Sequence, residues 1–196
     1  MSQLNVDVIK NSGGTGPGLE FLSGGNFAFD TDTLYIDTSN GRVGINTSSP
    51  NSSIHVEGDR GAYFDCHPML EGAEIVANRS NSSTTLYAAT ASTYLYTSTN
   101  NGNWTPNIRG ASDGTSLDSM MATGDSLVMT LISPINSSSG YAAGLDIDGS
   151  GRGVDWADDE QPSERGGNSG YDVYSYTIIK TGGNSFVVLG SKTWFN

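Results

Sequence analysis

Apolar residues at the start of the chain alternate with polar ones, which is the period of a β-strand. Leu4, Val6 and Val8 are separated by single polar residues, and Ile9 follows directly. The Gly-rich residues 11–18 come next and predict a turn or linker. A strand this short cannot stand alone, so we expect residues 4–9 to dock on a larger body or to pair with copies of themselves.

Residues 27–58 contain four further short runs of this kind. The runs are 27–29, 34–36, 42–45 and 54–56, and each is bounded by Asp, Asn, Ser, Gly or Pro. The dipeptide Asn40-Gly41 is strongly favoured in hairpin turns and predicts a hairpin between the second run and the third. Strands of three or four residues bury little surface within one chain. They predict a β stalk in which several chains wrap the same segments around a common axis.

After residue 59 the sequence indicates a different domain. Two Thr-, Tyr- and Ala-rich strands are expected between residues 84 and 96, and a buried strand at 125–132. Residues 171–180 and 185–192 predict a hairpin with its turn at 181–184, and residues 116–121 predict one capped helical turn. Short strands at regular spacing with Gly-rich turns are typical of a jelly-roll β-sandwich. The expected fold class is therefore all-β.

Composition and charge exclude several classes of protein. Of the 196 residues 26 are Gly and only 15% are charged, whereas coiled coils and helical bundles are rich in Ala, Glu, Lys and Leu. The net charge is −12 and the nine basic residues are scattered singly, so nucleic acid is not an expected partner. We expect no membrane span and no signal peptide, because no long apolar run occurs. The single cysteine, Cys66, cannot form an intrachain disulfide.

Two groups of residues resemble known protein families. The first is DTLYID at 32–37, NGRVGINTSSP at 40–50 and IHVEG at 54–58. It resembles a module of bacteriophage tail fibres, with Asn46 in place of the usual glycine, a position that asks for a positive or unrestricted φ. The second group resembles the C-terminal domain repeated in virion structural proteins of marine cyanophages. It comprises WTPNIR at 104–109, SLDSMMATGDS at 116–126, LDIDGS at 145–150, Trp156, DVYSYTIIKT at 172–181 and FVVL at 186–189.

The resemblance implies trimeric fibres or decorations that attach by the N-terminus and end in a β-sandwich head. We therefore expect a virion-anchoring segment at 1–26, a short intertwined trimeric β stalk at 27–59 and a jelly-roll-like head at 60–196. The anchor strand would use Leu4, Val6, Val8 and Ile9.

A threefold axis in the stalk would supply a core that one chain lacks. Three copies of Val43, Ile45, Ile54 and Val56 would meet at that axis. Gly44 would permit a close approach of backbones there.

Few residues indicate metal chemistry or catalysis. The sequence DIDGSG at 146–151 begins like a calcium loop, but Ala157 stands where an EF-hand needs a bidentate Glu, so a β-turn is expected. A glycan hydrolase would need paired carboxylates, such as Asp155 with Asp158 or Asp159. These lie in a Gly- and Ser-rich loop, whereas precise catalysis favours rigid elements. We expect no catalytic residue, no metal and no cofactor.

Exposed aromatic residues offer a better candidate for binding. Aromatic faces stack on sugars, and neighbouring carboxylates bind sugar hydroxyls. The candidate glycan contacts are Trp156, Tyr141 and Asp155.

Together these features predict a non-enzymatic phage virion structural protein, a homotrimeric tail fibre or adhesin that projects from the particle and contacts the host surface. Its expected partners are two further copies of itself, other virion proteins through the N-terminus, and host-surface glycan. It is expected on the virion surface after assembly in the host cytoplasm, without membrane insertion. Two alternatives stay open: a capsid decoration or head-fibre protein, and a polysaccharide-degrading tail spike.

Overall fold

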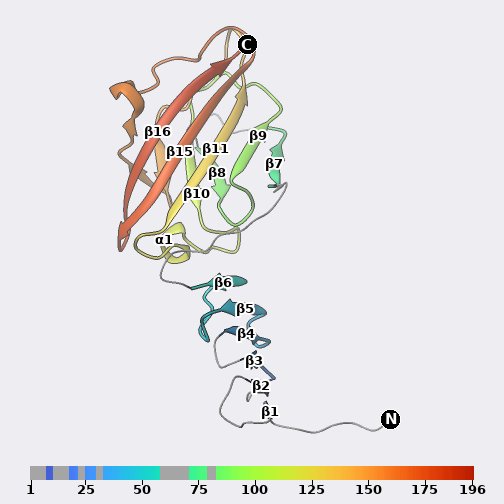
Figure 1. Ribbon diagram of the computed structural model, residues 1–196. Coiled ribbons are helices and arrows are strands. Elements are labelled where there is room, and N and C mark those ends of the chain that lie inside the picture. The colour runs from blue at the N-terminus through green and yellow to red at the C-terminus, as the bar shows by residue number, and fades with distance from the viewer. Residues whose placement is uncertain (1–7, 11–17, 22–24, 30–32, 58–70, 79–82) are drawn as a thin grey trace. The chain divides into compact units, whose positions relative to one another are not determined.

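The protein is all-β, as the strand pattern predicts. The computed structural model describes residues 8–10, 18–21, 25–29, 33–57, 71–78 and 83–196. The chain forms two compact units, Met1–Pro68 (unit 1) and Met69–Asn196 (unit 2), and both are built from β-strands (Figure 1). Helical structure in the described residues is limited to α1, Leu117–Met120, and one 3-10 turn, η1, Ala157–Asp159. Neither is long and apolar enough to cross a membrane.

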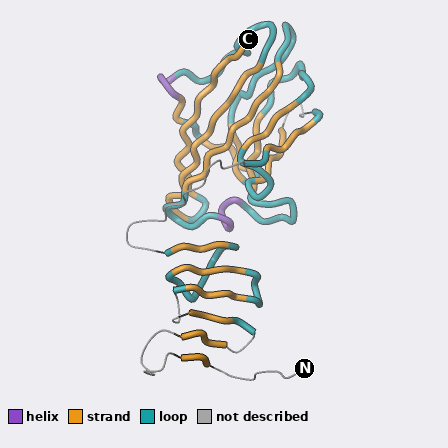
Figure 2. Tube along the Cα trace, turned by 45° about the vertical axis from the view of Figure 1, so that its right-hand side comes forward, coloured by secondary structure: helices purple, strands orange, loops and turns teal. Residues whose placement is uncertain are grey.

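Unit 1 is a single sheet of six short strands that pair in chain order (Figure 2). Neighbouring strands are antiparallel from β1 to β5, whereas β6 runs parallel to β5. Val8 and Ile9 lie in β1, while Leu4 and Val6 lie outside the described residues. The strands are β1 (Val8–Lys10), β2 (Gly18–Phe21), β3 (Phe27–Phe29), β4 (Leu34–Asp37), β5 (Arg42–Ile45) and β6 (Ile54–Val56).

The predicted hairpin at Asn40-Gly41 is confirmed, since β4 and β5 pair antiparallel and Gly41 has a φ of 65°. The carboxylate of Asp37 closes the turn: its Oδ1 accepts the backbone N–H of Ser39 at 3.0 Å and of Asn40 at 3.1 Å. Asn46 has the predicted positive φ, 58°.

The loop after β5 explains why glycine stands at position 44. A Cβ at Gly44 would lie 2.3 Å from the carbonyl oxygen of Thr47, within the same chain. The side chain of Arg42, in β5, also contacts this loop: its Nη1 donates to the carbonyl of Pro50 at 2.8 Å. Glycine at position 44 is therefore required by the loop of the single chain, and the approach of backbones from different chains expected there stays a prediction.

Unit 2 consists of two sheets that share one core. The six-stranded sheet has the order β14-β16-β15-β11-β9-β7 and the four-stranded sheet the order β13-β12-β10-β8. The strands of the first are β7 (Ala73–Val76), β9 (Thr93–Tyr96), β11 (Ser126–Pro134), β14 (Asp155–Trp156), β15 (Tyr171–Gly182) and β16 (Ser185–Phe195). Those of the second are β8 (Ser83–Tyr87), β10 (Thr105–Arg109), β12 (Leu145–Ile147) and β13 (Ser150–Arg152).

Side chains from both sheets and from α1 meet in this core. The indole of Trp104, 1% exposed, contacts the ring edges of Tyr96 and Tyr174 at centroid distances of 5.6 and 6.0 Å. Leu117 brings α1 into the same cluster. The aliphatic members include Leu86, Ile108, Leu145 and Ile147 from the four-stranded sheet and Met129, Leu131, Ile178 and Val188 from the six-stranded sheet.

Strand direction in unit 2 differs from the predicted jelly roll. The chain alternates between the two sheets from β7 to β12, so β7, β9 and β11 run parallel in one sheet and β8, β10 and β12 in the other. A jelly roll is built from antiparallel Greek keys. Hydrophobic alternation indicates which side of a strand is buried but leaves the direction of its neighbour open, so it cannot separate the two arrangements.

The individual elements predicted for this unit are confirmed. β15 and β16 form the long antiparallel hairpin, and Asn184 in its turn has a φ of 50°. The strand predicted at 125–132 is β11, but only one side of it is buried: Met129 and Leu131 are 0% exposed, whereas Val128 is 51% exposed. The single helical turn is α1, where the side chain of Ser116 accepts the backbone N–H of Ser119.

Candidate functional site

A shallow groove of about 410 Å³ lies along the β14 edge of the six-stranded sheet. β14 pairs parallel with β16, which places Asp155 beside Leu189 and Trp156 beside Gly190. Two of the three predicted glycan contacts therefore border one groove. The other residues that line the groove have short or apolar side chains: Ala157, Ser175, Thr177, Leu189, Gly190 and Ser191.

Trp156 is half-buried and belongs to the margin of the core as much as to the groove. Its ring packs edge-on against Tyr176 at a centroid distance of 5.8 Å. A Cβ at Gly190 would lie 2.9 Å from Cε3 of Trp156, so glycine there makes room for the indole. Asp155, by contrast, is exposed. The groove thus combines one anchored aromatic edge with one solvent-facing carboxylate.

Tyr141, the third predicted contact, does not line this groove. Its backbone N–H donates to Oδ1 of Asn103 at 3.3 Å, and its carbonyl accepts the N–H of Trp104 at 3.1 Å. These bonds hold Tyr141 in the loop before β12, half-buried.

The carboxylates weighed as a hydrolase pair do not share a hollow. Asp155 lines the groove described above, whereas Asp158 lines a neighbouring depression of about 290 Å³ with Glu160, Glu164 and Lys192. Asp159 lines neither of these two depressions. In the described part of the chain, no three His, Cys, Asp or Glu side chains are grouped so that they could hold a metal ion.

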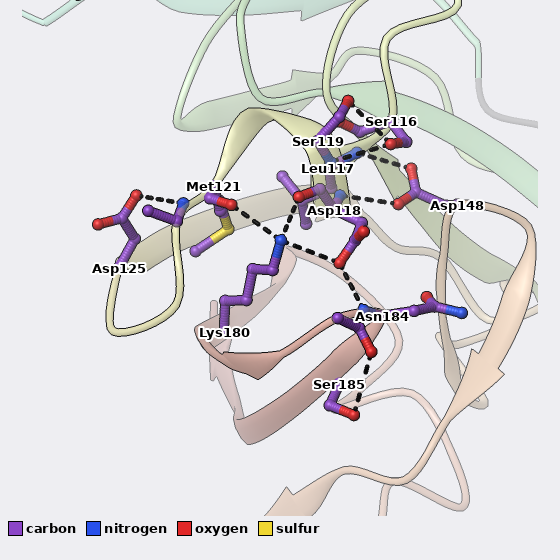
Figure 3. Close-up of polar contacts among 12 residues, drawn as sticks. Ser116, Leu117, Asp118, Ser119, Met121, Asp125, Asp148, Lys180, Asn184 and Ser185 are labelled. Carbon is purple, nitrogen blue, oxygen red and sulfur yellow. Dashed lines mark hydrogen bonds and ion pairs between the residues drawn. The ribbon is translucent and has the colours of Figure 1, made fainter. Parts of the chain in front are cut away.

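The segment that begins like a calcium loop forms a hairpin turn and caps a helix. Asp148 and Gly149, with φ of 54° and 80°, connect β12 to β13, as the turn prediction requires. The two carboxylate oxygens of Asp148 accept the backbone N–H groups of Leu117 at 2.8 Å and Asp118 at 3.0 Å (Figure 3). The carboxylate of Asp148 therefore caps the first turn of α1.

Lys180 links α1 to the β15–β16 hairpin (Figure 3). Its ammonium donates to the carbonyls of Asp118 and, at 2.9 Å, Met121, and it forms an ion pair with the Asp118 carboxylate at 3.0 Å. The N–H of Asn184 donates to the same carboxylate at 2.6 Å. This hydrogen bond, with the contact to Lys180, holds the pKa of Asp118 below its ordinary value. The cluster joins segments more than sixty residues apart, and we assign it a structural role.

Three exposed aromatic side chains near the C-terminus are absent from the sequence-based candidates. Tyr171 and Phe195 are a cross-strand pair, 44% and 55% exposed, and Trp194 is 43% exposed. Trp194 lies against Gly166 and Gly167 and donates its Nε1–H to the carbonyl of Ser169 at 2.9 Å. The alternation of the hairpin, with Tyr174 and Tyr176 facing the core, was the available signal that Tyr171 faces outward.

The predicted axis residues of unit 1 lie together on one side of its sheet. Cross-strand pairs join Val43 to Ile54 and Ile45 to Val56, so all four share a side, which Leu34 and Ile36 extend. Ile54 is 61% exposed and Ile45 37%, and the others are half-buried. We call these six residues the apolar side of unit 1.

Comparison with known proteins adds no family to these observations. No protein-family model, no curated protein and no solved structure matches this chain.

Proposed function

We propose that this protein is a non-enzymatic phage virion structural protein, a homotrimeric tail fibre that projects from the particle and contacts the host surface. The observation that carries the proposal is the apolar side of unit 1. Its strands have three or four residues, and side chains such as Ile54 stay in solvent within one chain. Burying a Val or Ile side chain is worth about 1.5–3 kcal/mol. Three copies around one axis would gain this burial several times over.

The wider proposal rests on sequence resemblance together with this geometry. The segment at 40–50 resembles a tail-fibre module, and the strands of residues 1–26 would provide the attachment to other virion proteins. The protein would then sit on the virion surface after assembly in the host cytoplasm. A capsid decoration or head fibre would use the same parts and differ in where the N-terminus docks.

Host contact is proposed for the groove beside Asp155 and Trp156, with Tyr141 as a further contact outside it. A half-buried indole edge and an exposed carboxylate are the chemistry by which proteins bind sugar rings and hydroxyls. A polysaccharide-degrading spike is the competing proposal. Asp155 and Asp158, the carboxylates it would need, line two adjacent depressions, so neither depression contains the pair.

The trimer is tested by light scattering on the full chain and on an Ile54→Asp variant. We expect a trimer mass for the parent and a lower mass for the variant, because three carboxylates would be brought to one axis. Ser48→Asp, on an exposed loop residue of the same unit, is the matched control and should leave the mass unchanged. A monomeric parent chain at micromolar concentration would contradict the proposal.

Position and host contact need separate measurements. Gold labelling of the C-terminus on whole virions distinguishes tail from capsid. For host contact, Asp155→Asn should weaken binding to host cells, while Asp158→Asn, in the neighbouring depression, should not. Release of reducing sugar from host envelope glycan by the purified protein would favour the spike instead.

A further inference from the structure

A second depression adjoins the groove at the β14 edge. It has a volume of about 570 Å³ and is lined by residues of β9 and β11, among them Thr93 and Thr130. Thr130 is the cross-strand partner of Ser175, which lines the groove. Residues directly opposite each other on neighbouring strands share one side of the sheet, with Cβ atoms about 5 Å apart. The two hollows therefore meet at this pair.

A row of hydroxyl groups crosses the sheet through both hollows. Cross-strand pairs join Ser191 to Ser175, Ser175 to Thr130 and Thr130 to Thr93, so the row passes over β16, β15, β11 and β9. All four residues are half-buried. Their hydroxyls make no hydrogen bond to any residue that the structure describes, so they are available to a ligand.

Apolar side chains flank this hydroxyl row, and a carboxylate lies at each end of it. Leu189 and Val128, 46% and 51% exposed, lie in the next row along the strands. Asp155 lines the groove, and Glu71 lines the second depression, where the Ser92 hydroxyl donates to Oε2 of Glu71 at 3.1 Å. A sugar ring has hydroxyl groups and apolar C–H faces, and this combination of side chains matches both.

We propose that the groove and the second depression together bind one glycan chain, which crosses the strands from Asp155 and Trp156 over the hydroxyl row to Glu71. The inference rests on the glycan groove of the proposed function and adds a second subsite to it. With strands about 4.8 Å apart, the row from Ser191 to Thr93 is roughly 14 Å long, which exceeds the width of one sugar ring. The site therefore favours an oligosaccharide over a single terminal sugar.

The charges of the site favour a glycan without acidic groups. Among the described residues that line the two hollows, the charged ones are Asp155 and Glu71, and none is Lys or Arg. A uronic acid, sulfate or phosphate group would meet a like charge at either end of the row, on a chain whose net charge is −12. Carboxylates accept hydrogen bonds from the hydroxyls of neutral sugars. The ligand class is therefore a neutral oligosaccharide.

Chain length and charge are tested first, by titration calorimetry on the full-length protein. The probes are neutral oligosaccharides released from host envelope glycan and graded from a disaccharide to a hexasaccharide, with acidic fractions of the same lengths beside them. We expect the hexasaccharide to bind about tenfold more tightly than the disaccharide, because it reaches the second subsite. The acidic fractions should bind more weakly, and high salt should narrow that difference.

Single substitutions then separate the second subsite from the first. Thr130→Val keeps the shape of the side chain but removes its hydroxyl, and should weaken hexasaccharide binding about threefold to tenfold without changing disaccharide binding. Glu71→Gln, at an exposed residue outside the strands, should do the same and keeps the test valid if a change in β11 disturbs folding. Asp155→Asn should weaken the binding of both lengths. Thr85→Val, at an exposed position of β8 in the other sheet, is the matched control and should change neither.

The outcomes distinguish this inference from the proposed function. If the hexasaccharide binds no more tightly than the disaccharide, or if Thr130→Val and Glu71→Gln change nothing, the second depression is not part of the site, although the glycan groove stands. Tighter binding of the acidic fractions would overturn the assignment to neutral glycan. If no fraction binds at any length, the inference and the proposed host contact both fail.

Discussion

Both units are built from β-strands, but unit 2 buries its apolar side chains within one chain and unit 1 leaves an apolar side exposed. Unit 2 has strands of 9, 12 and 11 residues in β11, β15 and β16, and side chains such as Trp104 and Tyr174 are almost fully buried in its own core. In unit 1 the strands have three or four residues, and no Leu, Ile, Val or aromatic side chain that the structure describes there is buried. Two sheets that face each other enclose a core within one chain, whereas a single ladder of short strands leaves its apolar side open.

An Ile→Ala substitution can be made in both units, and the larger effect is expected in unit 2. Ile108→Ala removes a side chain that is 0% exposed in unit 2 and should lower the free energy of unfolding by about 3–4 kcal/mol. The loss should not depend on protein concentration, because this core lies within one chain. Urea unfolding followed by Trp fluorescence measures it.

Ile54→Ala makes the matched change at a position that is 61% exposed in one chain. Within a single chain it should cost less than about 0.5 kcal/mol. In the proposed trimer it should raise the protein concentration at which the complex dissociates. If Ile54→Ala changes neither association nor stability, the apolar side of unit 1 has no partner and the proposed trimer contact is contradicted.

A smaller effect is expected from two neighbouring tyrosines in the core of unit 2. The hydroxyl of Tyr174 accepts the N–H of Ala142 at 3.0 Å and donates to Oδ2 of Asp172 at 3.4 Å. The hydroxyl of Tyr176 is buried and has no hydrogen-bond partner among the described residues, and burial raises its pKa. Tyr174→Phe should therefore cost about 2 kcal/mol, while Tyr176→Phe should leave stability unchanged or raise it by up to about 1 kcal/mol.

Thermal and urea unfolding of the two tyrosine variants would decide this point. Equal losses in both would mean that the Tyr176 hydroxyl makes a contact as strong as that of Tyr174. Both tyrosine hydroxyls would then have hydrogen-bond partners in the core of unit 2.

The smallest expected effect is a difference in acid sensitivity between the units. The pKa of Asp118 lies below its ordinary value of 3.8 because the N–H of Asn184 and the side chain of Lys180 bind the carboxylate. In unit 1 the pKa of Asp37 is also lowered, first by the side chain of Asn40. A lowered pKa in the folded state contributes stability that is complete above the unfolded value and is lost as pH falls through the folded value.

Asp118→Asn should therefore flatten the decline in unit 2 stability between about pH 5 and pH 2, and Asp37→Asn should leave that decline unchanged. Burial raises the pKa of Asp172, which acts with the opposite sign and is present in both chains. The difference between the pH profiles of the variant and the parent therefore reports on Asp118 alone. A parent and an Asp118→Asn variant with the same pH profile would contradict the assignment of Asp118 as the ionised partner of Lys180 and Asn184.

Local sequence pattern is sufficient for several elements of this protein, although it does not predict β2, β7 or β10. Alternation places Met129 and Leu131 in the core, Ser116 begins α1, and Gly41, Asn46 and Asn184 occupy turns with positive φ. These features depend on residues within a few positions of each other, so neighbouring side chains and backbone conformation decide them.

The local sequence predicts only part of the candidate site. Asp155 and Trp156 come together because they are adjacent in the chain, but the groove they border needs Leu189 and Ser175 from two other strands. Tyr141 belongs to a different loop, and the exposed pair of Tyr171 and Phe195 depends on the register of a hairpin. Alternation does not set that register.

Strand partners and the role of the Asp148 carboxylate are decided only by the tertiary structure. The parallel ladders β7–β9–β11 and β8–β10–β12 arise because the chain crosses between two sheets, which no local signal records. The carboxylate of Asp148 becomes a cap for α1, thirty residues away, instead of a calcium ligand.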